Sequence, residues 1–305
     1  MQKWLFIISF ILSGVLAEAQ LEPLSNQYML NTLAINPAYA GSRDAMSITM
    51  LHRNQWTGFE GSPKTFTVAV HSPMRNEKVG LGLLAVNNRI GITNSSGFSG
   101  NFAYRIYMGN GILSLGLSGG FTFTSNRWSD LVAIDMDDGL IPMNTRKYLL
   151  PNFSVGTYYY SDQLFIGLSI PMFLSHNFNS ATQEFDLVND YSEYNYLINS
   201  GYLIQISETW KALPSLMLRL NPGSAAQIDL NASVIYRDKV WAGFSYRTNQ
   251  SFVGLFIYQV NRQLAIAYTY DMGFGKIGGY MGGSHEIMIR YEFRYMIDVV
   301  NPRYF

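Results

Sequence analysis

The sequence predicts an all-β protein, a transmembrane antiparallel β-barrel of about 14 strands with short periplasmic turns and longer extracellular loops. Three observations predict it: an N-terminal export signal, apolar residues at every second position, and connections that alternate between short and long. The 305 residues include no cysteine, carry no formal net charge, and are 14% charged and 15% aromatic. This composition excludes a disulfide scaffold, a Cys-ligated metal protein and a basic nucleic-acid binder.

Residues 1–19 are typical of a secretory signal peptide. Lys3 gives a basic start, an apolar run extends from Trp4 to Leu16, and Ala17 and Ala19 form a small-residue cleavage site. Beyond the signal no run of about 18 consecutive apolar residues occurs, so we expect no membrane helix in the mature chain. An exported, aromatic-rich chain of this kind is either a secreted soluble sandwich or an outer-membrane barrel.

Residues 20–43 do not alternate, and Pro37 and Gly41 supply turn signals. We therefore expect an irregular segment that lies in the periplasm or in the barrel lumen. The barrel itself is expected over residues 44–295, followed by a C-terminal tail over residues 296–305.

Within the barrel region, apolar residues recur with a period of two. In the segment that ends at Tyr236, Ile228 and Leu230 share one face while Asp229 and Asn231 share the other. Most segments run about 9 to 13 residues, longer than soluble strands and close to the 9 to 11 that cross a bilayer at a tilt. We expect strands at roughly 44–54, 65–73, 78–87, 97–107, 112–124, 150–160, 163–173, 196–206, 212–221, 226–236, 239–247, 251–260, 262–271 and 284–295.

The connections between these segments provide an independent indication. All the even-numbered ones are short, whereas the first, fifth, seventh and thirteenth are long, notably Ser125 to Leu149 and Leu174 to Asn195. The third is intermediate, and the ninth and eleventh are short as well. Bacterial barrels alternate in this way and have an even number of strands, so we expect both chain termini in the periplasm. Because lipid offers the backbone no hydrogen-bond partner, each strand must pair on both sides, which favours a closed barrel.

Aromatic and charged residues have expected places in such a barrel. Aromatic residues near strand ends are predicted to form interfacial girdles: Tyr158 to Tyr160, Tyr268 with Tyr270, and Tyr291 with Phe293. A charge on the lipid face costs about 2–4 kcal/mol near the midplane. We therefore expect four charged residues of the last strand to face the lumen: Glu286, Arg290, Glu292 and Arg294.

Three motifs that suggest other functions have plainer explanations. Residues 273–278 match the glycine-rich dinucleotide fingerprint, but a strand follows where a Rossmann turn leads into a helix. The acidic cluster Asp135, Asp137 and Asp138 completes no EF-hand, and a solvated loop explains it better. No catalytic or metal-pair motif accompanies any of the four histidines, His52, His71, His176 and His285. We expect no enzyme, no metal site and no cofactor; a hydrolase that uses His52 or His285 is the third hypothesis.

The start of the mature chain carries a block of recognisable motifs: Gln27-Tyr28-Met29, Asn36-Pro37-Ala38-Tyr39-Ala40-Gly41-Ser42-Arg43, Arg53-Asn54-Gln55-Trp56 with Gly58-Phe59, and Pro63-Lys64-Thr65. This block resembles the opening of the PorP/SprF family, outer-membrane proteins of the type IX secretion system of Bacteroidota. The resemblance continues through Val79-Gly80-Leu81-Gly82 to the ending Asn301-Pro302-Arg303-Tyr304-Phe305.

The resemblance implies a role in exporting or retaining large surface proteins, including gliding-motility adhesins, through the C-terminal domains of those cargoes. The implied partners are a secreted cargo protein with a C-terminal sorting domain, other type IX secretion components and periplasmic peptidoglycan-associated components. Outer-membrane lipid is a further expected partner, and nucleic acid is not.

Two sets of residues are candidate contacts. The motif residues are expected to contact a partner or to plug the lumen: Asn36, Pro37, Tyr39, Gly41, Arg43, Arg53, Asn54, Gln55, Trp56 and Pro63. The irregular N-terminal block suits a plug, because a barrel of 14 strands is wide enough to hold one. Apolar residues of the two longest loops form a docking surface or pack over the barrel mouth: Trp128, Leu131, Ile134, Phe178, Phe185 and Tyr191.

The leading hypothesis is a non-enzymatic outer-membrane barrel of the type IX secretion system that assists export and surface retention of a large adhesin-type cargo. The alternative is an outer-membrane diffusion or transport channel for small or apolar solutes, which strand number and aromatic content alone would support.

Overall fold

The structure is a computed structural model of the whole chain, and it describes Tyr28 and residues 31–75, 77–127, 147–179, 184–248, 251–274 and 282–293. The expected signal peptide (1–19) and C-terminal tail (296–305) lie outside these residues, as do the glycine-rich stretch 275–281 and Arg294. Within the described part of the chain, no helix has the length and apolar character needed to cross a membrane.

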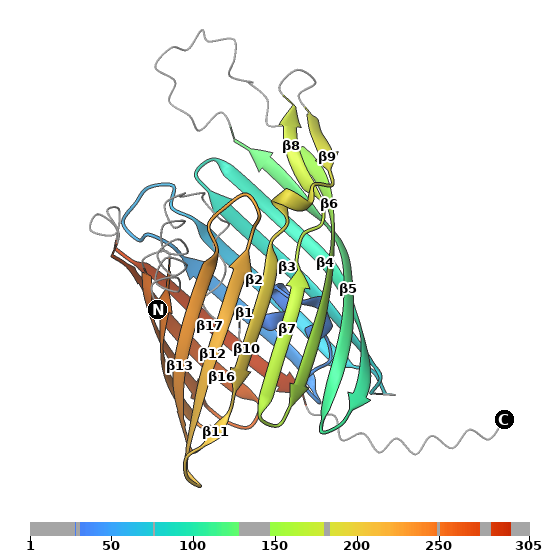
Figure 1. Cartoon of the computed structure of the whole chain (residues 1–305). Coiled ribbons are helices and arrows are strands. Elements are labelled where there is room, and N and C mark those ends of the chain that lie inside the picture. The colour runs from blue at the N-terminus through green and yellow to red at the C-terminus, as the bar shows by residue number, and fades with distance from the viewer. Residues whose placement is uncertain are drawn as a thin grey trace, which may run out of the picture.

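Fourteen strands form one closed, antiparallel barrel (Figure 1). They are β1 (Met46–Asn54), β2 (Lys64–Pro73), β3 (Val79–Ile90), β4 (Thr93–Met108), β5 (Gly111–Asn126), β6 (Lys147–Ser161), β7 (Leu164–Ile170), β10 (Tyr196–Tyr202), β12 (Trp210–Leu220), β13 (Gln227–Tyr236), β14 (Val240–Arg247), β15 (Ser251–Gln259), β16 (Leu264–Gly273) and β17 (Ser284–Phe293). The short β11 (Ile204–Gln205) continues β10 against β12. Each of the 14 predicted segments corresponds to one barrel strand, so the predicted fold class is confirmed.

The barrel closes where its first and last strands meet. β1 pairs with β17 from Met46 opposite Phe293 to Asn54 opposite His285. Every other neighbouring pair is also antiparallel, including β7 with β10 across the longest connection, and β10 with β12. Closure gives the backbone N–H and C=O groups at the strand edges hydrogen-bond partners, which lipid cannot supply.

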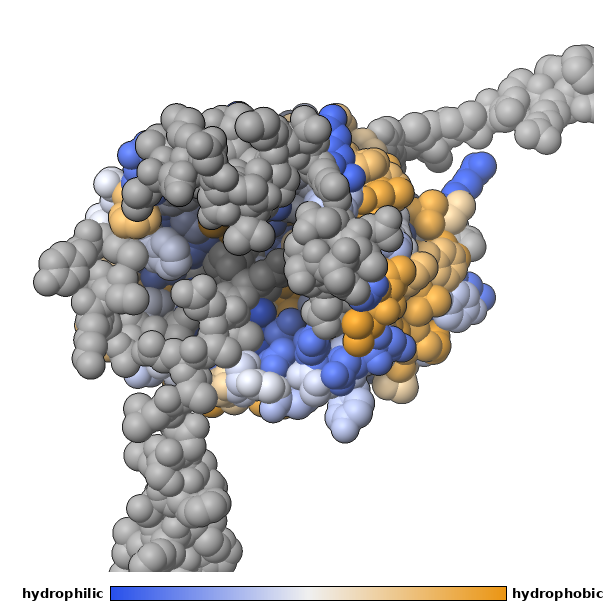
Figure 2. Space-filling model, turned by 90° about the horizontal axis from the view of Figure 1, so that it is seen from above, coloured by the Kyte–Doolittle hydropathy of each residue, from blue (hydrophilic) through white to orange (hydrophobic). Residues whose placement is uncertain are grey.

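Side chains alternate between the two faces of the wall. On β16, the residues that face inward are buried: Ala265, Ala267, Thr269 and Asp271. Their neighbours face outward and are large, apolar or aromatic, and exposed: Ile266, Tyr268, Tyr270 and Met272. Seen from above, hydrophilic residues gather inside the mouth, and hydrophobic residues cover the outer flank at the right (Figure 2). This is the arrangement of a wall with lipid outside and polar groups inside.

Outward-facing aromatic residues mark both ends of the barrel. At the end with long connections, Phe252 stacks on Phe274 with their ring centroids 4.7 Å apart. At the end with short turns, Trp210 lies against Tyr236 at 4.6 Å. Aromatic girdles at two levels are typical of barrels that span a membrane.

The girdle prediction for Tyr158 and Tyr160 was wrong. Tyr158 is buried in the lumen, with its ring centroid 5.3 Å from that of Tyr39. The hydroxyl of Tyr160 accepts a hydrogen bond from Arg105 Nε at 3.0 Å, also on the inner face. A run of three tyrosines near a strand end does not say which of them face inward; only the register of the strand decides that.

The connection between β7 and β10 contains structure that the sequence did not predict. It forms a separate hairpin of β8 (Ser175–Asn179) and β9 (Glu184–Val188), followed by a turn of 3₁₀ helix, η4 (Tyr191–Glu193). The hairpin stands above the barrel at the long-loop end (Figure 1). Strands of five residues are too short to give a clear period-two signal, which is why they were missed.

Candidate functional site, a plug in the barrel lumen

A segment at the start of the mature chain lies inside the barrel. We call Tyr28 and residues 31–43 the plug. It contains two short turns of 3₁₀ helix, η1 (Thr32–Ala34) and η2 (Pro37–Tyr39). Ala38, Ala40 and Asn36 are completely buried. The turns appear as the blue coils inside the barrel in Figure 1.

Local chemistry explains the second turn. The Asn36 side chain caps it, because its Oδ1 accepts a hydrogen bond from the Ala38 N–H at 3.0 Å. Pro37 occupies the first helical position, where a backbone N–H would have no partner within the helix, so proline loses no hydrogen bond there. The Asn-Pro pair of the motif block therefore begins η2.

Three strand glycines receive the plug, and we call Gly80, Gly116 and Gly156 the glycine seat. They lie on β3, β5 and β6, and all three face inward. A Cβ atom at Gly80 would overlap the Ala40 carbonyl, one at Gly116 the Ala38 backbone nitrogen, and one at Gly156 the Asn36 side chain. The backbone of η2 thus lies directly on the wall, an approach that only glycine permits.

Hydrogen bonds join the plug to several strands. Asn36 Nδ2 donates to the carbonyls of Thr157 on β6 and Leu168 on β7, at 2.9 and 3.3 Å. Ser169 Oγ donates to the Ile35 carbonyl at 2.7 Å. These bonds satisfy buried groups that would otherwise cost about 1–3 kcal/mol each.

Two further hydrogen bonds join the plug to strands that are far apart around the barrel. The Gly41 N–H donates to His71 Nδ1 on β2 at 3.2 Å. Far around the barrel, Asn231 Nδ2 on β13 donates to the Tyr28 hydroxyl. The plug therefore bonds to strands on different sides of the barrel.

The plug also has an apolar core. Leu33, Ala38, Tyr39 and Ala40 pack with Ala69, Ala103 and Tyr158 of the wall. The Tyr39 ring meets His71 and Tyr158 edge to face, with centroids 5.2 and 5.3 Å apart. Such aromatic pairs add about 0.5–1.5 kcal/mol each beyond area burial. The plug is thus packed like a protein interior.

Most of the buried charges among the described residues form two groups on the inner wall. At the long-loop end, Arg53 pairs with Glu286 at 3.0 Å and with Asp271 at 3.3 Å. Arg247 pairs with Asp229 at 3.0 Å and reaches Asp271 at 3.5 Å. We call these five residues the rim network. Because it links β1, β13, β14, β16 and β17, it braces the wall where the barrel closes.

The second group lies at the short-turn end and includes the plug. Arg43 Nε bonds Glu292 at 2.8 Å, and Arg290 Nε bonds the same carboxylate at 3.2 Å. Glu286, Arg290 and Glu292 thus face the lumen as predicted from the last strand.

The ten motif residues separate into two places. Asn36, Pro37, Tyr39, Gly41 and Arg43 belong to the plug. The other five lie at the long-loop end of β1 and in the loop after it: Arg53, Asn54, Gln55, Trp56 and Pro63.

Residues of the second set hold the loop over residues 55–63, which we call the rim loop, against the barrel. The Gln55 N–H donates to the Pro63 carbonyl at 2.9 Å, and both residues are buried. Trp56 is 42% exposed and has a positive φ of 49°, a strained value for a bulky residue. The Thr57 N–H holds the loop to the Gly283 carbonyl at 2.9 Å.

The predicted docking residues are only partly visible. Trp128, Leu131 and Ile134 lie outside the described residues. Phe178 and Phe185 are opposite each other on β8 and β9, but their side chains are not described. Tyr191 on η4 is 74% exposed, so one of the six presents its ring to solvent at the long-loop end.

The histidines have separate environments. His52 faces outward and is exposed, whereas His71 is buried against the plug. His285 also faces outward and bonds the Tyr268 hydroxyl at 2.7 Å. Among the described residues, no group of three or more His, Asp or Glu side chains is arranged to hold a metal ion.

Comparison with a solved structure supports the architecture. A monoaromatic hydrocarbon channel, CymD, superposes with a TM-score of 0.52 at 11% identity, covering 93% of this chain and 97% of that one. The outer membrane protein Omp33 of Acinetobacter baumannii matches with a TM-score of 0.47 at 9% identity, over 82% of this chain and 98% of that one. At such low identity, the first match shows the fold alone. No curated protein sequence matches the chain.

The barrel fold alone does not identify the protein family, but a family model does. The model that describes type IX secretion system membrane proteins matches residues 17–291, from before the plug to the last strand. With the barrel and its two aromatic girdles, this match indicates an outer-membrane protein associated with secretion. The chain belongs to the PorP/SprF family of type IX secretion system membrane proteins.

Proposed function

We propose that this protein is a plugged, non-enzymatic barrel that assists export and surface retention of a large adhesin-type cargo, which it recognises through the cargo's C-terminal sorting domain. The observation that supports it best is the plug, which is built into the wall of a barrel from a secretion family. A lumen that already holds part of the chain leaves the two ends of the barrel as the main surfaces for partners.

The plug argues against a pore as the main function. Its backbone lies on three strands, and hydrogen bonds from its backbone and side chains join it to β2, β6 and β13. The part of the lumen that the plug occupies is therefore closed to solutes, because packed protein interiors leave few voids larger than a water molecule.

We assign the long-loop end to the cell exterior and the short turns, with both chain termini, to the periplasm. The even strand number and the alternation of connections support this orientation, which is usual for bacterial barrels. Cargo would then contact the rim loop, η4 and their neighbours. Secretion components and peptidoglycan-associated proteins would contact the short turns.

Exposed aromatic side chains at the long-loop end suit a cargo surface. Trp56, Phe59 and Tyr191 are 42%, 63% and 74% exposed. Large aromatic residues on a rigid backbone are the usual anchors of protein interfaces, because they bury much area and lose little entropy. A role in gliding motility follows if the retained cargo is a gliding adhesin.

A diffusion or transport channel for small or apolar solutes is the second candidate. The similarity of fold to CymD is the observation that favours it, although that similarity concerns the barrel and not the lumen. Conductance of the purified full-length protein in planar bilayers separates the two candidates. Stable, solute-dependent conductance would favour the channel, and closed bilayers favour the plugged barrel.

Deletion and complementation test the export role. A strain that lacks the gene should lose one or more large surface proteins from the cell surface, and the wild-type gene should restore them. A double variant, Trp56→Ser with Phe59→Ser, should insert normally but display less cargo, whereas Phe66→Ser on the lipid-facing side of β2 serves as the control. Normal display of every surface adhesin by the deletion strain would overturn the proposal.

A further inference from the structure

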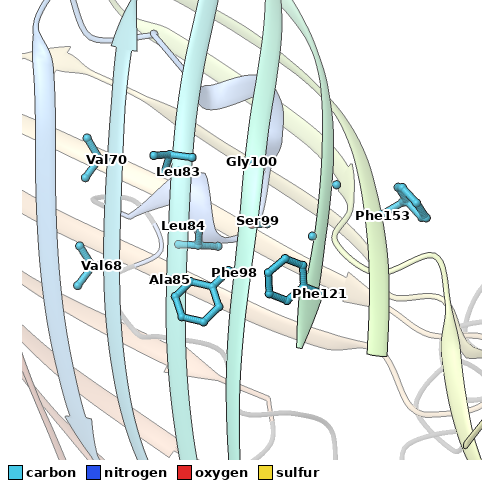
Figure 3. Close-up of a pocket in the computed structure, with 12 residues that line it drawn as sticks. Val68, Val70, Leu83, Leu84, Ala85, Phe98, Ser99, Gly100, Phe121 and Phe153 are labelled. Atoms are coloured by element: carbon cyan, nitrogen blue, oxygen red, sulfur yellow. The ribbon is translucent and has the colours of Figure 1, made fainter. Parts of the chain in front are cut away.

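A pocket of about 580 Å³ opens on the outer wall over β2 to β6 (Figure 3). Its floor is made by Gly100 and Gly119, which are direct partners on β4 and β5. Leu83 and Phe153 stand on the neighbouring strands, and Phe98 and Phe121 close one end with ring centroids 6.0 Å apart. We call this the glycine pocket.

The local structure does not require glycine at these positions. Among the described atoms, none lies within 4 Å of the place that a Cβ would take at Gly100. At Gly119 the Phe153 ring is at 3.6 Å, an ordinary contact distance. Neither residue has a positive φ. Glycine weakens a strand, and in a strand interior it often marks a place where another group approaches closely.

The depth of the pocket limits what can enter it. Gly100 lies halfway along β4 and Gly119 halfway along β5, and each strand has 16 residues. Half such a strand rises about 18 Å along the membrane normal at a tilt of about 45°. The apolar band of a barrel is about 25 Å tall. Even with the short turns placed at the edge of that band, the pocket lies inside it.

The width of the pocket decides which kind of apolar group can reach its floor. Neighbouring strands are about 4.8 Å apart, so about 14 Å separates the backbones of β3 and β6. Leu83 and Phe153, which are 67% and 56% exposed, narrow this opening. A transmembrane helix is about 10–12 Å across with its side chains and would rest on these walls. A single hydrocarbon chain reaches the floor.

We infer that the glycine pocket holds an acyl chain of a lipid from the surrounding membrane. The pocket is continuous with the wall that faces lipid, so lipid is the occupant that the bilayer supplies. No hydrophobic driving force favours binding within hydrocarbon. Dispersion contacts between the acyl chain and the pocket floor retain the lipid, because the atoms of an empty floor would have no van der Waals partners. This inference does not depend on the export role.

Lipid retention in filled-pocket variants tests the inference. The full-length protein is purified in mild detergent, and bound lipid is counted by native mass spectrometry as activation energy rises. Gly100→Leu and Gly119→Leu should retain at least tenfold less lipid than wild type. Gly254→Leu is the matched control, because Gly254 also faces outward with no described atom within 4 Å of a Cβ, but its partners are Phe244 and Tyr270. Equal retention in all four proteins overturns the inference.

A second measurement uses the wild-type chain, so it does not depend on how the variants fold. Phosphatidylethanolamine with a photoactivatable group in its acyl chain is reconstituted with the protein, and crosslinked residues are mapped. Crosslinks should concentrate on Leu83, Phe98, Phe121 and Phe153 relative to outward residues of β13 to β15. An even distribution around the wall, or crosslinking of the pocket to a second copy of the chain, overturns the inference.

Discussion

Glycines on the two faces of the wall behave differently. The seat glycines, Gly80, Gly116 and Gly156, face inward, where a Cβ would overlap the plug. The pocket glycines, Gly100 and Gly119, face outward, where a Cβ would meet no described atom within 4 Å or only the Phe153 ring at an ordinary contact distance. The same residue type therefore has two roles. On the inner face, glycine lets the plug approach the wall closely; on the outer face, glycine leaves room at the surface that faces the membrane. The inner face should therefore tolerate little change, and the outer face much more.

The largest effect is expected for the rim network on the inner face. Arg53→Met removes the guanidinium that bonds Glu286 and Asp271 and should destabilise the barrel by about 3–5 kcal/mol, because both carboxylates then stay buried without this cation, although Asp271 keeps its contact with Arg247. Guanidinium unfolding in lipid vesicles measures the change. Met50→Leu, at an exposed outward position of the same strand, should cost less than about 1.5 kcal/mol. Similar losses for both variants would remove the contrast between the faces.

The next effect compares the two kinds of glycine directly. Gly116→Ala should cost about 1–3 kcal/mol, because the added methyl group pushes the plug from β5. Gly100→Ala should leave stability unchanged or raise it by about 0.5–1 kcal/mol, since alanine limits the unfolded chain and meets no described atom. Thermal unfolding, followed by the gel shift of heated barrels, ranks the variants. A stable Gly116→Ala protein would mean that the plug is not held at its seat.

A smaller effect is expected for a single plug hydrogen bond. Ser169→Ala removes the hydroxyl that donates to the buried Ile35 carbonyl at 2.7 Å and should cost about 1–2 kcal/mol. Ser125→Ala provides the comparison, because its hydroxyl bonds the Asn94 carbonyl at 3.4 Å near the half-exposed rim. The same unfolding titration should show little change there. Equal effects would indicate that burial in the lumen adds nothing to the bond.

The smallest effect is a local pH dependence outside the membrane. The Ser192 N–H donates to Asp190 Oδ1 at 2.9 Å, which holds the pKa of that carboxyl below its usual value. A lowered pKa means that the cap of η4 is complete above the ordinary range and is lost as the pH falls through the lowered value. Hydrogen exchange around Ser192, corrected for intrinsic rates, should accelerate only in acid. Asp190→Asn should abolish this dependence, and an unchanged profile would exclude the cap as its cause.

Most of the barrel was predictable from the sequence. Period-two patterning is local, so it identified 14 segments without knowledge of their partners. The ends were less certain: β4, β5 and β6 extend beyond their predicted limits, while β7 ends at Ile170. The extension of β4 and β5 is at the long-loop end, where polar residues such as Asn94 and Ser95 blur the alternation.

The plug and its seat were less predictable. The motif block singled out Asn36, Tyr39 and Gly41, but nothing in the sequence pointed to Gly116 or Gly156 as their partners. Interior strand glycines were the available signal, yet the outward Gly100 has the same local pattern. Asn36 bonds Thr157 across 121 residues of chain, and local pattern carries no information at that separation.

By itself, the sequence determined the strand period, the number of strands and the choice of membrane over water, because each follows from the hydrophobicity of neighbouring residues. Only the tertiary structure decided which tyrosines face inward, which glycines receive the plug and where the outer wall is hollow. These depend on register and on closure of the barrel, which bring together residues that are distant in the chain.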